Sequence, residues 1–212
     1  MAKRNDKTLG LVQMAIMIAL IFVLVFFVNI TIGPLNITLA MIPVCIGSIL
    51  FGAKKGALLG FCFGLAQFLK NTMMPGVVSF VFTPFYSVGD IHGNGWSLVI
   101  SFLPRILVGV VPYFVFIALF NLFKKTKTAK NIALCVAGAS AAITNTTLVL
   151  SGIYIFFGDA YASALGDAFN VLISGTILTN AIPEAIVCAI TIPAVCNVLF
   201  KTTKSTSTIR KY

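Results

Sequence analysis

Apolar segments long enough to cross a lipid bilayer recur along this chain, and they restrict its fold more than any other feature. Hydrophobic residues make up 59% of the 212 residues and charged residues only 9%, and the mean hydropathy is +1.05. Soluble domains are nearer 45–50% apolar and about 25% charged. Because one span needs about 20 apolar residues, the length predicts an all-α integral membrane protein: a compact bundle of six transmembrane helices forming a single domain over 1–212.

The apolar runs and the breaks between them predict where these helices lie. We expect helices at Leu9–Val28, Ile37–Phe51, Ala57–Thr72, Ser97–Phe120, Asn131–Phe157 and Val171–Phe200. The connection Met73–Trp96 is too apolar for a solvated linker, and its length favours a folded, functional cap on the bundle. The polar, basic stretch 201–212 predicts a disordered cytoplasmic tail.

Positive charge is distributed unevenly among the connections. Thirteen of the fifteen Lys and Arg residues fall in four clusters, at the two ends of the chain and in two alternate connections, "GAKKG" and "KKTKTAK". Cytoplasmic loops are the ones enriched in Lys and Arg, so both termini are predicted to be cytoplasmic. The net charge of +10 therefore indicates topology, with weak attraction to anionic lipid, and not a nucleic-acid partner.

Small residues recur at a spacing of four, which places them on one face of a helix. Gly56, Gly60 and Gly64 follow this spacing in the third predicted helix, and "AGASAA" lies in the fifth. Membrane helices associate through close packing at small residues, so we interpret these faces as helix contacts within the bundle.

Polar side chains inside the predicted spans gather in the outer half to the middle of the membrane. Ionisable groups at such depth are costly and usually face a cavity or each other, so this level predicts an outward-facing binding pocket. The candidate residues for binding a substrate are Arg105, Asn145, Asn180 and Glu184 inside the spans, with Lys70, Asn71, Asn36 and Thr38 at the outer ends of the second and third helices.

Arg105 is the most informative of these residues. A guanidinium offers two parallel N–H donors that match a carboxylate or phosphate, while asparagines suit hydroxyls and amides. The alternative is that Arg105 and Glu184 form a salt bridge that joins two helices without any ligand. Glu184 follows Pro183 directly, so a structural role at that break is a further alternative.

Several catalytic and cofactor motifs are absent from the sequence. It has no GxxxxGK[ST] phosphate loop, no HExxH and a single histidine, His92, in an outer loop. The five cysteines fall in apolar segments without a CxxC, which indicates packing and not metal or redox chemistry. These absences predict a non-enzymatic binder without metal or cofactor. A solitary transporter with Glu184 as its proton site, or a ligand-free scaffold, are the competing hypotheses.

Three stretches carry a resemblance to a known family: "LNITLAMIPVCIGSILFGAKKGALLGFCFGL", "TNTTLVLSGIYIFFG" and "TNAIPEAIVCAITIPAV". With the six predicted spans and an AxxxA in the first helix, the chain resembles the substrate-binding S components of energy-coupling-factor (ECF) vitamin transporters in the prokaryotic plasma membrane. The resemblance implies partners, a transmembrane T subunit and two ATPases, and assigns the T-subunit contact to Ala15 and Ala19. It also implies a substrate site among the outer ends of the last three helices, under two capping loops.

The ligand implied by the resemblance is a vitamin. The three stretches look most like S components of the pantothenate type, and pantothenate carries a carboxylate, an amide and two hydroxyls that suit one arginine with asparagines. Folate, which also carries carboxylates, is the runner-up. Riboflavin is disfavoured because a flat ring system calls for more stacking partners than these spans contain.

Overall fold

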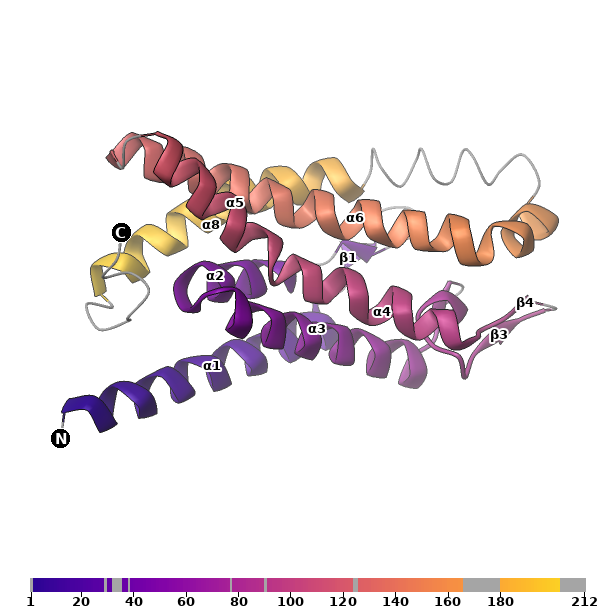
Figure 1. The fold of residues 1–212 in the computed structure, drawn as a ribbon. Helices are drawn as coiled ribbons and strands as arrows, with labels where there is room; N and C mark the ends of the chain where they lie inside the picture. The colour runs from indigo at the N-terminus through magenta and orange to yellow at the C-terminus, as the bar shows by residue number, and fades with distance from the viewer. Residues whose placement is uncertain are drawn as a thin grey trace.

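The structure is a computed structural model that describes residues 2–28, 30–31, 36–37, 39–76, 78–89, 91–123, 126–165 and 180–202. Long helices run side by side along the axis of an elongated bundle (Figure 1). One short hairpin lies among the helices and a second lies at one end of the bundle. The start of the first helix and the end of the last one lie at the same end of the bundle. The side of the membrane on which the two ends lie stays a prediction.

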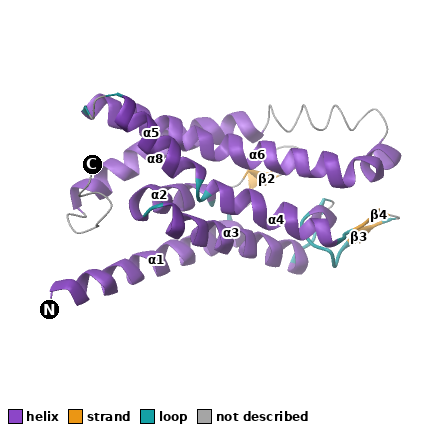
Figure 2. Ribbon diagram, viewed as in Figure 1, coloured by secondary structure: helices purple, strands orange, loops and turns teal. Residues whose placement is uncertain are grey.

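The described helices are α1 (Ala2–Phe27), α2 (Met41–Phe51), α3 (Ala53–Met73), η1 (Ser79–Val81), α4 (Gly95–Val108), α5 (Val111–Leu122), α6 (Lys127–Leu165) and α8 (Ile182–Thr202). The strands are β1 (Ile30–Thr31), β2 (Asn36–Ile37), β3 (Ser87–Val88) and β4 (Ile91–His92), paired antiparallel as β1 with β2 and β3 with β4 (Figure 2). Of the predicted tail, 203–212 lies outside the described residues.

The predicted helical class is confirmed, whereas the number of six membrane spans stays a prediction. Four stretches of the described residues are long and apolar enough to cross a membrane: Thr8–Phe27, Gly95–Leu122, Lys127–Gly158 and Ile182–Phe200. Helix α2 is apolar but short, and α3 carries three lysines and a glutamine that lower its hydropathy. These two shorter or more polar helices are packed among the long ones.

Several predicted helix boundaries were wrong. The first helix was expected to start at Leu9 and the fifth to end at Phe157, but α1 starts at Ala2 and α6 continues to Leu165. In both cases the helix extends into polar residues, which hydropathy does not count as part of a span. The second helix was expected to start at Ile37, but Ile37 pairs with Ile30 in the first hairpin and α2 starts at Met41. The fourth was expected to run unbroken from Ser97 to Phe120, but it divides at Gly109 into α4 and α5. Pro112 cannot donate a backbone hydrogen bond to the preceding turn, so the ladder is interrupted there. For the last helix, the predicted start at Val171 lies outside the described residues.

The glycine face of α3 packs directly on the backbone of α4, as the spacing predicted. A methyl group on Gly56 would collide with the carbonyl oxygen of Gly109, and one on Gly60 with that of Arg105. Gly64 faces the carbonyl oxygen of Ser101 in the same way. Backbones can approach this closely only where no Cβ intervenes, so the three glycines determine how close α4, and with it Arg105, lies to α3.

The described residues between α3 and α4, at 74–76, 78–89 and 91–94, form a folded cap on the bundle, and the prediction of an ordered connection is confirmed. Phe80, Val81 and Phe82 at its centre are buried. They form a hydrophobic cluster with Ile100 of α4 and with residues of α6. His92 lies in strand β4 of the second hairpin, where its Nδ1 is 2.9 Å from the hydroxyl of Ser87.

The main hydrophobic core surrounds α2 and contacts α1, α3, α5, α6 and α8. Cys45, Cys188 and Cys196 are buried within it as free thiols, and Cys62 and Cys135 are half-buried. The cysteines therefore act as packing residues, as expected. This core stabilises the part of the bundle around α2, and the hydrophobic cluster that the cap forms with α4 and α6 stabilises the end next to the cap.

Candidate ligand-binding site

Arg105 lies on the face of α4 that packs against α3 and the cap, and only 3% of its surface is exposed. Arg105 is buried because it shares a helix face with two buried serines and because α3 packs closely against it. Ser97, Ser101 and Arg105 are spaced four apart, so they line one face of α4, and the two serines are fully buried. Gly60 brings the backbone of α3 against that of Arg105 from the side.

The proline that precedes Arg105 explains one of its contacts. In a regular helix the carbonyl of Ile100 would accept a hydrogen bond from the backbone nitrogen of residue 104, but Pro104 has no N–H to donate. The Nη1 of Arg105 donates to this carbonyl instead, at 2.8 Å. The Pro-Arg pair therefore provides both an orphan acceptor and the side chain that satisfies it.

The remaining surroundings of the guanidinium are aromatic. Its Cζ lies 5.2 Å from the ring centroid of Phe82, in the cap, and 5.8 Å from that of Phe63, on α3. The Nε of Arg105 is buried and has no hydrogen-bond partner in the part of the chain that the structure describes. Leaving a buried donor unsatisfied is costly, so this N–H is a donor available to a bound anion.

Glu184 is the acidic group that acts on Arg105. It lies on α8 with 4% of its surface exposed and interacts electrostatically with the guanidinium. The charges of the two residues that the sequence singled out, one on α4 and one on α8, therefore interact. This interaction is compatible both with a joint ligand site and with a structural pair.

Two asparagines are also buried in the bundle interior. Asn145 of α6 and Asn180, one turn before Glu184 at the start of α8, are each less than a tenth exposed. The Oδ1 of Asn145 makes no hydrogen bond within the described residues. Arg105, Asn145, Asn180 and Glu184 therefore place donors and acceptors from three helices in the bundle interior, which we call the buried polar set.

The other predicted binding residues lie at the edge of the bundle. Asn71, near the end of α3, accepts a hydrogen bond from the hydroxyl of Ser79 at 2.7 Å and donates to the carbonyl of Gln67 at 2.8 Å, so it fastens the cap to α3. Lys70 beside it is half-buried. Asn36 belongs to β2, and its side chain, like the whole of Thr38, lies outside the described residues.

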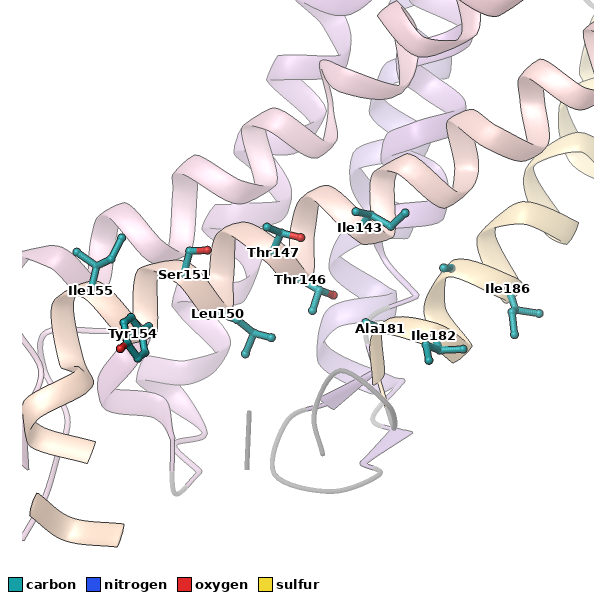
Figure 3. Close-up of a pocket in the computed structure, with 11 residues that line it drawn as sticks. Ile143, Thr146, Thr147, Leu150, Ser151, Tyr154, Ile155, Ala181, Ile182 and Ile186 are labelled. Carbon is teal, nitrogen blue, oxygen red and sulfur yellow. The ribbon is translucent and has the colours of Figure 1, made fainter. Parts of the chain in front are cut away.

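A groove of about 800 Å³ runs between α6 and α8, with its side chains contributed by those two helices (Figure 3). Its lining is mainly apolar but includes the hydroxyls of Thr146, Thr147, Ser151 and Tyr154. Ala181 and Ala185 also line it. They follow Asn180 and Glu184 directly in the sequence, but none of the four residues of the buried polar set is among the lining residues. This groove was not predicted from the sequence, although hydroxyls at 147, 151 and 154 follow the helical spacing that marks one face.

Helix α1 presents an apolar face away from the bundle. It contacts the core through Met14, Ile21 and Val25, whereas Ala15 and Ala19 are exposed. The exposed side also carries large apolar side chains: Leu11, Val12, Ile16, Leu20 and Val23. We call this surface the outer face of α1. It is available to lipid or to a partner helix.

Metal chemistry has no support within the described part of the chain. No three His, Cys, Asp or Glu side chains there lie together in a way that could hold a metal ion. The buried polar set contains one cation, one acid and two amides. Such a set can bind a small polar anion through hydrogen bonds and charge.

Comparison with known proteins places this arrangement in a family. The chain is 37% identical over 202 residues to the pantothenic acid transporter PanT of Lactococcus lactis subsp. cremoris (strain MG1363), a match covering 94% of this chain and 96% of that protein. A solved structure described as the S component of a bacterial ECF transporter matches the fold with a TM-score of 0.53 at 17% identity, covering 92% of this chain and 95% of the other. Residues 10–196 match the family described as "ECF transporter, substrate-specific component". The chain is therefore a membrane-embedded member of the ECF transporter family, and within it a substrate-specific component.

Proposed function

We propose that this S component binds pantothenate and passes it inward when it is coupled to a transmembrane T subunit and two ATPases. The observation that carries the substrate is the 37% identity, over almost the full length of both chains, to a pantothenic acid transporter. The buried polar set supports it chemically. Pantothenate has one carboxylate, one amide and two hydroxyls, and the set offers a guanidinium, two amides and a carboxylate to match them.

Each group of the ligand has a suitable partner in this proposal. Arg105 binds the carboxylate through Nε and its free terminal donors, because charge-assisted hydrogen bonds in a fork geometry are the strong ones. Asn145 and Asn180 pair with the amide and the hydroxyls, since each can donate and accept. Glu184 balances the charge of the guanidinium in the empty site. In the filled site its carboxylate accepts a hydrogen bond from a ligand hydroxyl. Lys70, Asn71, Asn36 and Thr38 are assigned in this proposal to the entrance of the site.

A ligand panel tests the substrate. We expect purified protein in lipid nanodiscs to bind radiolabelled pantothenate saturably and to gain thermal stability with pantothenate, because a ligand that binds only the folded state stabilises it by mass action. Folate and riboflavin are expected to give no shift at the same concentration. A shift with folate but not with pantothenate would replace the proposed substrate, and no shift with any vitamin would contradict a vitamin site.

The proposed topology has six spans with both termini in the cytoplasm, so that the buried polar set opens outward and the basic connections face the partner ATPases. In this arrangement the chain has no motor of its own. Uptake of pantothenate into cells that lack the T subunit and its ATPases would favour the solitary, proton-coupled alternative centred on Glu184.

The outer face of α1 is proposed as the T-subunit contact. We expect Ala19→Trp to abolish pantothenate uptake in cells that contain the complete transporter, because a bulky ring prevents the close helix approach that small residues permit. Binding by the purified variant should be unchanged, since Ala19 is exposed and distant in the fold from the buried polar set. Ala118→Trp, at an exposed position of α5, is the matched control and should leave uptake intact. Equal loss in both variants would place the contact elsewhere.

A further inference from the structure

We propose that Phe82 and Phe63 are positioning residues for Arg105, which hold its guanidinium in the orientation that binds an anion. Because Phe82 belongs to the cap, this orientation depends on the attachment of the cap to α4. This inference rests on the proposed function, because it assigns the carboxylate of the ligand to Arg105. It goes further by naming two residues that do not touch the ligand and yet determine whether the site prefers a charged one.

The first step is the orientation of the guanidinium. The hydrogen bond from Nη1 to the carbonyl of Ile100 fixes one corner of the group. The rings of Phe82 and Phe63 lie within 6 Å of Cζ, the range in which a cation is attracted to an aromatic face. These three contacts hold the guanidinium while its Nε stays without a partner among the described residues. The donor edge is thus held ready for a ligand.

The second step is the attachment of Phe82 to α4. The hydroxyl of Ser101 donates to the carbonyl of Phe82 at 2.6 Å, and the hydroxyl of Ser97 donates to the carbonyl of Phe80 at 2.7 Å. Both bonds are buried, and Ser97, Ser101 and Arg105 follow one another at a spacing of four on α4. Three successive turns of one helix face therefore bind the cap, the last of them through the ring of Phe82.

The third step is the consequence for specificity. In water an arginine is free to rotate and pays conformational entropy on binding, whereas a preorganised fork loses less per hydrogen bond formed. The aromatic rings also stabilise the cation, in addition to the charge of Glu184. Removing a ring should therefore weaken binding of a carboxylate ligand while leaving binding of its neutral analogue nearly unchanged.

The experiment compares two ligands across matched variants. Phe82→Leu keeps an apolar side chain of similar size but removes the ring. We expect its affinity for pantothenate to fall about 10- to 30-fold, and its affinity for pantothenol, in which the carboxylate is replaced by a primary alcohol, to change less than about threefold. Phe63→Leu should show the same selectivity, with a smaller effect because its ring lies farther from Cζ.

Phe80→Leu is the matched control. Phe80 lies two residues before Phe82 in the same cap, is equally buried, and packs its ring edge-on against Phe157 of α6. If cap stability alone mattered, both substitutions would weaken pantothenate and pantothenol together. Selective loss of pantothenate in Phe82→Leu but not in Phe80→Leu supports the inference.

A second variant tests the link through the cap without altering any ring. Ser101→Ala removes the bond to the carbonyl of Phe82 and is expected to reduce pantothenate affinity more than pantothenol affinity. Parallel loss of both ligands in Phe82→Leu and Ser101→Ala would overturn the positioning role. Failure of the unaltered protein to bind pantothenate at all would instead refute the proposed substrate, so the two failures are distinguishable.

Discussion

Arg105→Ala is expected to lower pantothenate affinity by about 100-fold, because truncating one partner of a buried, charged hydrogen bond costs about 2–5 kcal/mol. Pantothenol, without the carboxylate, should lose much less. Isothermal titration of the purified variant in nanodiscs measures both affinities. The bundle should stay folded, since α4 is held to α3 through backbone contacts at glycines and to the cap through Ser97 and Ser101.

Arg105→Lys separates charge from geometry. Lysine keeps the positive charge but presents a single point donor in place of the planar fork, and it cannot reproduce the contact to Ile100 together with the free Nε. We expect an affinity between those of the unaltered protein and Arg105→Ala. Unfolding of Arg105→Ala, with normal folding of Arg105→Lys, would instead support the structural salt bridge to Glu184 and contradict the ligand role.

Gly60→Ala is expected to lower the free energy of unfolding by about 3 kcal/mol, the upper part of the range for inserting a group into a well-packed contact. In an isolated helix the same change would be favourable by about 1 kcal/mol. The sign is reversed here because the new methyl group would meet the carbonyl oxygen of Arg105, which is backbone and cannot rotate away. Unfolding in SDS, followed by circular dichroism, measures the effect.

Gly158→Ala supplies the control for that substitution. Gly158 also lies within a helix, α6, but a methyl group there would meet no atom within 4 Å. Its stability should be unchanged or slightly raised. Because Gly60 sets the position of the Arg105 backbone, Gly60→Ala should also weaken pantothenate binding at temperatures where it remains folded. A neutral Gly60→Ala would show that α3 and α4 do not pack as closely as described.

The class of fold and the polar residues of the interior could be predicted from local pattern. Hydropathy determines that the chain is a helical membrane protein, because bilayer-length apolar segments have no other stable environment. The cost of burying polar groups in hydrocarbon identifies Arg105, Asn145, Asn180 and Glu184 one at a time. Glycine spacing predicted the contact face of α3, because periodicity alone shows which residues share a face.

The boundaries that failed depend on partners distant in the chain or on breaks within an apolar run. Ile37 belongs to a strand because Ile30 pairs with it, and nothing in its own neighbourhood distinguishes it from a helix start. The division between α4 and α5 at Gly109 lies in an uninterrupted apolar stretch, where hydropathy is the same on either side. The hydroxyl-lined groove of α6 was missed for a related reason, since Thr and Ser are common in spans without forming any site.

Hydropathy and one arginine within an apolar segment were enough to specify a membrane bundle with a buried cation, and Pro104 in the same helix leaves the carbonyl of Ile100 free to accept from it. The groups that surround Arg105 from other segments are known only from the folded chain: the ring of Phe63 from α3, the ring of Phe82 from the cap and the charge of Glu184 on α8. The free-energy cost of burying a side chain depends on its residue type, so it can be estimated from the sequence alone. The contacts that offset this cost come from residues brought together across distant segments, which local pattern does not encode.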